Sequence, residues 1–115
     1  MGANDCIFCK IYNGETPGEI LYSDSNIFVI KDINPRAPVH LLIIPIRHLT
    51  SLAYIGPAQV PIIGQIFVVA EEMARRQGIT LSGYRVVINQ GPDSGQIIDH
   101  IHYHLIGGAK LKHLG

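Results

Sequence analysis

Residues 100–108 read His100-Ile101-His102-Tyr103-His104-Leu105-Ile106-Gly107-Gly108, which places half of the chain's six histidines within five residues. Imidazoles at every second position, separated by apolar or aromatic residues, show the alternation of a β-strand whose two faces differ. The three histidines are therefore predicted to share one face of a strand. On a flat strand the outer two would stand ~13 Å apart, too far to bind one metal ion together.

The whole chain has the size and composition expected of one domain spanning residues 1–115. Its residues are 47% hydrophobic and 16% charged, with a formal net charge of zero. This balance gives no general attraction to nucleic acid or to an anionic membrane, so neither is expected as a partner. The first five residues lack the basic and apolar segments of a signal peptide, and a cytoplasmic location is expected.

The order of apolar runs and turn residues predicts a mixture of helices and strands. Helices are expected over 6–12, with Asp5 as N-cap, and over 62–77, ended by Gly78. The expected strands span 20–22, 27–30, 41–44 and 84–88, and the last of these should pair antiparallel with the histidine segment.

The predicted long helix has a broad apolar arc of about 160°. Gly64 and Val68 lie outside that arc and offer a second contact surface. Two interpretations stay open from this feature: a helix packed on one side only, or a helix that also contacts a second subunit.

The chain's two cysteines, Cys6 and Cys9, form a Cys-x-x-Cys pair. In a reducing compartment this spacing favours metal binding over a structural disulfide. A thioredoxin-like redox pair would follow a strand, and no strand can precede Cys6.

The histidine cluster also suits phosphoryl chemistry. A neutral imidazole that attacks phosphorus forms a phosphohistidine, which divides one difficult displacement into two steps. Neighbouring imidazoles and the backbone N–H groups of the glycine-rich turn at 89–95 could hold the phosphoryl oxygens.

Residues 100–106 resemble the His-φ-His-φ-His-φ-φ signature of the histidine triad (HIT) family, where φ is hydrophobic. The resemblance continues over most of the chain, at 6–11, 32–35, 37–40, 44–45 with His48, 83–85, 87–89, 95–96 and 107–108. The final Gly-Gly is similar to the HINT branch of nucleoside phosphoramidases, whereas the FHIT-like branch of dinucleotide hydrolases ends differently. The resemblance implies an α+β fold with a five-stranded antiparallel sheet, one long helix and one short helix. It also implies a homodimer in which two sheets run on into one and the long helix lies at the interface.

The resemblance further implies roles for individual residues. His102 would be the nucleophile, His104 a donor to phosphate oxygens, and His100 and His40 the polar surroundings. Asp32 would bind the ribose hydroxyls and Asn89 the phosphate or leaving-group side. The remaining nucleotide-binding residues would be Ile7, Phe8, Ile11, Ile30, Ile33 and Leu42 around the purine, and Gly95, Gln96 and Ile97 around the phosphate. From the residues alone, Asp32 could equally be a turn former and the apolar residues plain core.

Two departures from the family pattern concern the leaving group. Ile97 stands where many HINT-branch members carry Ser, and the chain ends at Gly115 without the aromatic segment that some members place near the substrate.

Four residues resemble the zinc ligands of some bacterial members: Cys6, Cys9, His48 and His100. Cys₂His₂ is a frequent structural zinc set. Buried, unliganded thiols are the alternative.

The leading interpretation is hydrolysis of purine nucleoside 5′-phosphoramidates, or of compounds resembling aminoacyl adenylates, through a nucleotidyl-His102 intermediate. No cofactor is expected for catalysis, and a structural zinc ion is possible. The alternatives are a nucleotide-binding or scaffold protein with negligible turnover and an FHIT-like dinucleoside polyphosphate hydrolase. A zinc hydrolase with several triad histidines as ligands is disfavoured by the spacing of the outer two.

Overall fold

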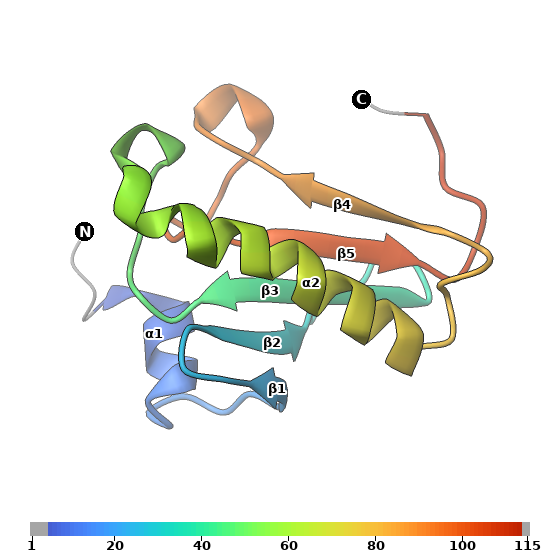
Figure 1. Ribbon diagram of the computed structural model, residues 1–115. Coiled ribbons are helices and arrows are strands. Elements are labelled where there is room, and N and C mark those ends of the chain that lie inside the picture. The colour runs from blue at the N-terminus through green and yellow to red at the C-terminus, as the bar shows by residue number, and fades with distance from the viewer. Residues whose placement is uncertain (1–4, 114–115) are drawn as a thin grey trace.

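The frame of the protein is a five-stranded antiparallel sheet, which the computed structural model shows together with two helices over residues 5–113 (Figure 1). The strands occur in the spatial order β1-β2-β3-β5-β4. Their bounds, with those of the helices and short 3₁₀ turns, are α1 (Ile7–Tyr12), β1 (Ile20–Ser23), β2 (Ile27–Lys31), β3 (Val39–Pro45), η2 (Leu52–Tyr54), η3 (Pro57–Gln59), α2 (Val60–Arg76), β4 (Tyr84–Ile88), η4 (Pro92–Ser94) and β5 (Tyr103–Gly107). The predicted α+β fold and the antiparallel pairing of β4 with β5 are thereby confirmed.

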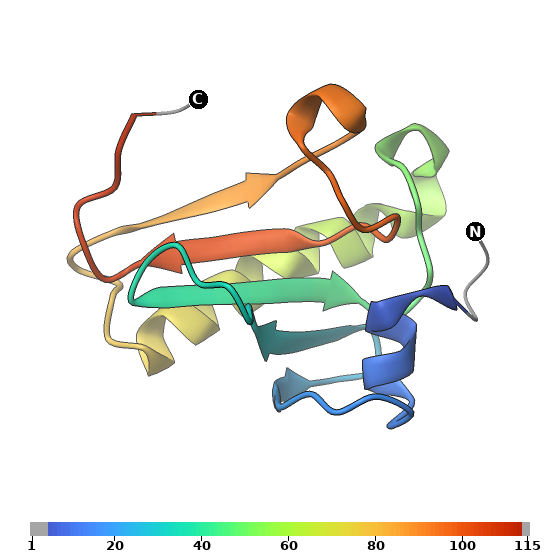
Figure 2. The ribbon, with the colours of Figure 1, turned by 180° about the vertical axis from the view of Figure 1, so that it is seen from behind.

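The central strand β3 is buried at every position, as its unbroken apolar run requires of a strand covered on both faces. α2 crosses one face of the sheet, and α1 lies against one end of the opposite face (Figures 1 and 2). β2 shows the consequence of this two-sided cover. Its residues Ile27 and Val29 join the core under α2, whereas Phe28 and Ile30 join a second core with Phe8 of α1.

The histidine segment alternates as predicted but is only partly a strand. Ile101 joins the core under α2, whereas the rings of His100 and His102 both contact Phe8 on the opposite face. The predicted strand was wrong in its extent, because β5 begins at Tyr103 and only His104 of the three histidines lies in it. Before Tyr103 the chain leaves the sheet ladder, and the Ile101 N–H donates to the carbonyl oxygen of Leu49 instead.

The ends of both helices differ from the prediction in detail. Cys6, not Asp5, is the N-cap of α1, and no side chain caps that end, so the predicted role of Asp5 was wrong. α2 begins at Val60, two residues earlier than predicted, because Pro61 is tolerated in a first turn that lacks internal hydrogen-bond partners. The left-handed conformation of Gly78, with φ of +73°, follows the end of the helix as predicted.

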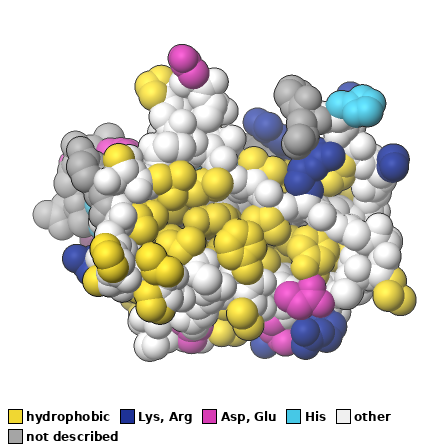
Figure 3. Space-filling model, turned by 45° about the horizontal axis from the view of Figure 1, so that its top comes forward, with side chains coloured by type: hydrophobic (Ala, Val, Ile, Leu, Met, Phe, Trp, Pro, Cys, Tyr) yellow, Lys and Arg dark blue, Asp and Glu magenta, His cyan; other side chains and the backbone are white. Residues whose placement is uncertain are grey.

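One apolar surface has no cover within residues 5–113. The side chains of Phe67 and Val68 on α2 are 55% and 70% exposed, and β4 is an edge strand of the sheet. Figure 3 shows hydrophobic side chains gathered on the side of the molecule that carries α2 and this edge. No helix in the described part of the chain is long and apolar enough to cross a membrane.

Candidate active site and metal centre

A cavity of about 380 Å³ opens on the sheet face opposite α2. It is bordered by α1, the loop between β2 and β3, and the loop after β4. All eleven residues predicted to bind the nucleotide line it, namely Ile7, Phe8, Ile11, Ile30, Asp32, Ile33, Leu42, Asn89, Gly95, Gln96 and Ile97. His40, His102 and His104 line it as well, whereas His100 does not. The cavity therefore combines an apolar end, suited to a flat base, with a cluster of imidazoles.

Four further residues line the cavity that the sequence reasoning missed: Lys31, Asn34, Arg36 and Ile98. Lys31 and Arg36 flank Asp32 in the chain and bring positive charge to a site that is expected to receive an anion. A basic residue on either side of a candidate ribose-binding carboxylate was the signal that could have identified them.

His102 is oriented by the backbone of its own segment. Its Nδ1 lies 2.7 Å from the carbonyl oxygen of His100, which can only accept a hydrogen bond. Nδ1 of the neutral ring therefore carries the proton and donates it, and Nε2 keeps its lone pair. The ring is buried and packs edge-on against Phe8 and His104, with centroid distances of 5.0 and 5.2 Å. This arrangement leaves one unprotonated nitrogen on a ring that lines the cavity.

His40 and His104 have their protons ordered in the same way. The backbone N–H of Arg36 donates to Nδ1 of His40 over 3.1 Å, so the proton of a neutral His40 lies on Nε2. That Nε2 lies 2.9 Å from Nδ1 of His104 and 3.3 Å from Oδ2 of Asp32. Because Nδ1 of His104 accepts from His40, the proton of a neutral His104 lies on its Nε2.

Burial keeps both rings neutral. Burial has the largest effect on the pKa of His104. Together with the charges that His102 and His40 would carry, it lowers this pKa to about 4. Burial also lowers the pKa of His40, against the opposing effect of Asp32. With the three rings neutral, the cavity holds a lone-pair nitrogen on His102 beside an N–H donor on His104. This is the pairing that nucleophilic attack on a phosphorus with charged oxygens requires.

Asp32, His40 and His104 also present donor atoms within 4.8 Å of one another, close enough to hold a metal ion. A metal on Nε2 of His40 would require the ring proton on Nδ1, which faces the Arg36 N–H. Two N–H groups would then oppose each other. The backbone at Arg36 therefore favours a hydrogen-bonded set of side chains over a metal centre at this place.

The loop after β4 is held together by Gln96. Its Oε1 accepts from the Gly91 N–H over 2.7 Å, and its Nε2 donates to the carbonyl oxygen of Ile98 over 3.1 Å. Gly91 and Gly95 have φ values of +84° and +89°, which favour glycine and explain the two glycines of this turn. The side chain of Gln96 thus shapes the loop, and its backbone stays beside the cavity.

A second cluster joins Cys6, Cys9, His48 and His100, whose donor atoms all lie within 4.8 Å of one another. Nδ1 of His100 is 3.2 Å from Sγ of Cys6 and 3.7 Å from Sγ of Cys9, and Nδ1 of His48 is 3.4 Å from Sγ of Cys9. Nε2 of His100 donates to the Pro45 carbonyl oxygen over 2.8 Å, so its Nδ1 lone pair points at the sulfurs.

The donor set fits a tetrahedral zinc ion. Ligand atoms around zinc lie ~3.5 Å apart when Zn–S is ~2.3 Å and Zn–N is ~2.0 Å, close to the separations found here. Without an ion, burial and the neighbouring Cys6 raise the pKa of the Cys9 thiol to about 11, and burial lowers the pKa of His100 to about 4. The buried Nε2 of His48 has no hydrogen-bond partner within the described residues. A bound cation would stabilise the thiolate that burial alone disfavours.

His100 thus serves the two clusters through different atoms. Its ring belongs to the Cys-His cluster, and its carbonyl oxygen receives the hydrogen bond from His102. The two predicted roles of His100, beside the nucleophile and as a zinc ligand, therefore fall to different atoms of the residue.

The comparisons with known proteins agree with this fold. The family model described as scavenger mRNA decapping enzyme C-term binding matches residues 5–113. The chain belongs to the histidine triad family, as its sequence predicted. It is 41% identical over 104 residues to protein HitA of Neisseria gonorrhoeae, covering 90% of this chain and 96% of that one. It is 43% identical over 108 residues to the 14 kDa zinc-binding protein of Zea mays, covering 92% and 84%.

Solved structures show the same fold. A histidine triad protein from Clostridium difficile matches with a TM-score of 0.93, 41% identity and full coverage of both chains. A HIT family hydrolase from Legionella pneumophila Philadelphia 1 matches with a TM-score of 0.90 and 38% identity, over 94% and 96% of the two chains. A Zn-bound histidine triad family protein from Mycobacterium smegmatis matches with a TM-score of 0.80 and 32% identity, over 96% and 82%. The protein therefore shares its fold with proteins described as HIT family hydrolases, and relatives described as zinc-binding or Zn-bound support a possible structural zinc ion.

Proposed function

We propose that the protein is a HINT-like purine nucleoside phosphoramidase, which hydrolyses the P–N bond of adenosine or guanosine 5′-phosphoramidates or of compounds resembling aminoacyl adenylates. The observation that carries the proposal is the pairing of an unprotonated Nε2 on His102 with an N–H on the adjacent His104. Phe8 and the isoleucines of the same cavity offer the apolar surface that a purine needs.

The reaction proceeds in two displacements. Nε2 of His102 attacks phosphorus, a new N–P bond forms, and the P–N bond to the amine breaks while the amine takes a proton from solvent water. A second water molecule then attacks the same phosphorus and releases a proton to the solvent, the His102 N–P bond breaks, and a nucleoside monophosphate leaves. Nε2–H of His104 donates to a phosphoryl oxygen in both steps, because its Nδ1 is already occupied by His40. Neither displacement requires a metal ion.

Asp32 would accept from the ribose hydroxyls. Its Oδ1 accepts from the backbone N–H of Asn34 over 2.8 Å, so it also forms the turn that its sequence context predicts. Oδ2 lies toward His40 and remains beside the cavity. The turn holds the carboxylate in place, and the two interpretations of Asp32 are compatible.

The proposal is tested by an alkaline denaturing quench of the protein with a ³²P-labelled adenosine phosphoramidate. Labelled nucleotide should remain attached to the wild type through a bond that is stable in base and labile in acid, and His102→Ala should retain none. Asp93→Asn, an exposed change outside the cavity lining, serves as a matched control that should label normally. Equal labelling of wild type and His102→Ala would overturn the role of His102.

A nucleotide-binding protein with negligible turnover is the second candidate, and Ile97 favours it. This side chain is 92% exposed at the cavity rim and offers no hydroxyl to protonate a departing amine. Steady-state hydrolysis of a fluorogenic adenosine phosphoramidate separates the candidates, since tight binding of AMP without turnover would select the binder. A dinucleoside polyphosphate assayed in parallel tests for the FHIT-like activity.

We further propose a homodimer in the cytoplasm. β4 leaves the N–H and C=O groups of an edge strand available for pairing, and the exposed Phe67 and Val68 lie on the adjacent helix. Pairing of two β4 edges would extend the sheets across the interface and cover α2. Nucleic acid and membranes are not proposed as partners, because the net charge is zero.

A further inference from the structure

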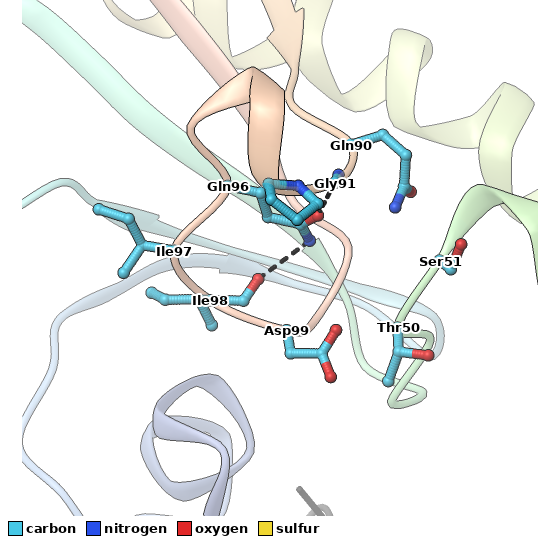
Figure 4. Close-up of a pocket in the computed structure, with 9 residues that line it drawn as sticks. Thr50, Ser51, Gln90, Gly91, Gln96, Ile97, Ile98 and Asp99 are labelled. Carbon is cyan, nitrogen blue, oxygen red and sulfur yellow. Dashed lines mark hydrogen bonds between the residues drawn. The ribbon is translucent and has the colours of Figure 1, made fainter.

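A second cavity of about 410 Å³ lies beside the first, on the other side of the loop after β4. Gln96, Ile97 and Ile98 line both cavities, so this short segment forms the wall between them. The remaining walls come from Thr50 and Ser51 after β3, from residues 90–92, and from Asp99 (Figure 4). A group attached to phosphorus at His102 could therefore extend over this wall.

Most polar side chains of the second cavity are used to build it. Oε1 of Gln90 accepts from the Leu52 N–H over 2.7 Å, Oγ of Ser51 accepts from the Ala53 N–H over 3.1 Å, and Gln96 holds its own loop. Among the side chains that the structure describes, none forms a hydrogen bond or ion pair with the Thr50 hydroxyl or the Asp99 carboxylate. Figure 4 shows the carboxylate of Asp99 turned toward Thr50, on the side of the loop away from Ile97.

The described residues that line this cavity bring charge of one sign to it. Asp99 is the one charged side chain among them, and none of them is a lysine, arginine or histidine. The first cavity differs, because Lys31 and Arg36 line it. A carboxylate with no cationic side chain among the described lining residues, beside a hydroxyl, favours an ammonium group, which can donate to both.

The short chain segment between Asp99 and His102 limits the distance between the two sites. Asp99 precedes His102 by three residues, so their Cα atoms are at most ~11 Å apart even in a fully extended backbone. A phosphorus atom at His102 and an ammonium group at Asp99 could thus belong to one leaving group with a short aliphatic chain between its two nitrogen atoms.

We propose that the second cavity binds the leaving group of the substrate and that Asp99 selects amines carrying a second, cationic nitrogen, such as diamines and lysine-like amines. The inference rests on the proposed phosphoramidase activity and specifies the amine side of its substrate. It assigns Asp99 a role in specificity and leaves the P–N cleavage itself to His102 and His104.

The test uses two adenosine 5′-phosphoramidates of equal length, one made with pentylamine and one with 1,5-diaminopentane. Wild type should show kcat/KM about fivefold higher for the diamine compound, mainly through a lower KM, as expected of one partly exposed ion pair. Asp99→Asn should remove this preference, and Asp93→Asn should keep it.

Binding of the same two compounds to His102→Ala measures the preference without turnover. A Kd about fivefold lower for the diamine compound, lost in the His102→Ala, Asp99→Asn double variant, supports the inference even if the wild type hydrolyses neither compound. That last result would contradict only the proposed activity. Equal binding of both compounds, or a preference that survives Asp99→Asn, would overturn the role of Asp99.

Discussion

Nδ1 of His102 and the carbonyl oxygen of His100 lie 2.7 Å apart, and this contact determines which nitrogen of His102 is free to react. The Arg36 N–H, 3.1 Å from Nδ1 of His40, places the proton of a neutral His40 on Nε2. That Nε2–H in turn places the proton of a neutral His104 on its Nε2. The three rings that line the cavity therefore have defined protons before any substrate binds. The backbone fixes the proton positions of His102 and His40, and His40 fixes that of His104. Fixed donors and acceptors lower the reorganisation that the transition state requires.

Replacing His104 with Gln should lower kcat about 100-fold, because the transition state loses a fixed N–H donor to a phosphoryl oxygen. The nucleotidyl-His102 intermediate should still form, only more slowly, and a single-turnover alkaline quench measures its rate. His113→Gln, an exposed histidine outside the cavity lining, is the control. Unchanged kcat in His104→Gln would contradict the donor role.

Acid should destabilise the fold through His104. Burial lowers its pKa to about 4 in the folded protein, whereas the unfolded chain binds this proton near pH 6.5. Between these values the unfolded state binds more protons, so the free energy of unfolding falls as the pH decreases from about 6.5 to about 4. The contribution of this one partly buried ring is on the order of 2 kcal/mol. Urea unfolding across this range should give a shallower pH dependence for His104→Gln than for wild type, whereas parallel curves would contradict the assignment.

Zinc content should follow the Cys-His cluster. Purified wild type should contain about one equivalent of zinc per chain by elemental analysis, and Cys6→Ser should contain close to none. Loss of the ion should lower Tm by about 5 °C or more, because metal binding is coupled to folding. His113→Gln should retain the ion. A metal-free wild type that keeps its Tm after treatment with a chelator would exclude the structural zinc site and leave buried, unliganded thiols.

A charge on the uncovered face of α2 should disrupt the proposed dimer. Val68→Glu would place a carboxylate among apolar side chains at the interface, whereas 70% exposure makes the same change harmless to an isolated chain. Light scattering should show a dimer for wild type and a monomer for the variant. Gln77→Glu, at the exposed C-terminal end of the helix, is the matched control. A wild type that is monomeric at every concentration would refute the dimer.

Local sequence patterns predicted most of the fold. The alternation at 100–105 gave the two faces correctly, because side chains of an extended chain point to opposite sides whether or not the ladder is complete. The apolar run before Pro45 identified the central strand, and Gly78 identified the end of the long helix. The start of β5 at Tyr103 was missed, because the extent of a strand depends on where its neighbours stop pairing.

The residue types of the candidate site could also be taken from the chain, but their arrangement could not. His40 and His104 are 64 positions apart, and only the antiparallel pairing of β3 with β5 brings their nitrogens to 2.9 Å. The same pairing leaves the ring of His100 to the cysteines of α1 and its carbonyl oxygen to His102. The motif at 100–106 thus determined the family by its resemblance, and the spacing of the histidines determined the faces and the candidate residues. Proton positions and the division of His100 between two sites required the tertiary structure, because hydrogen bonds depend on distances that sequence separation does not fix.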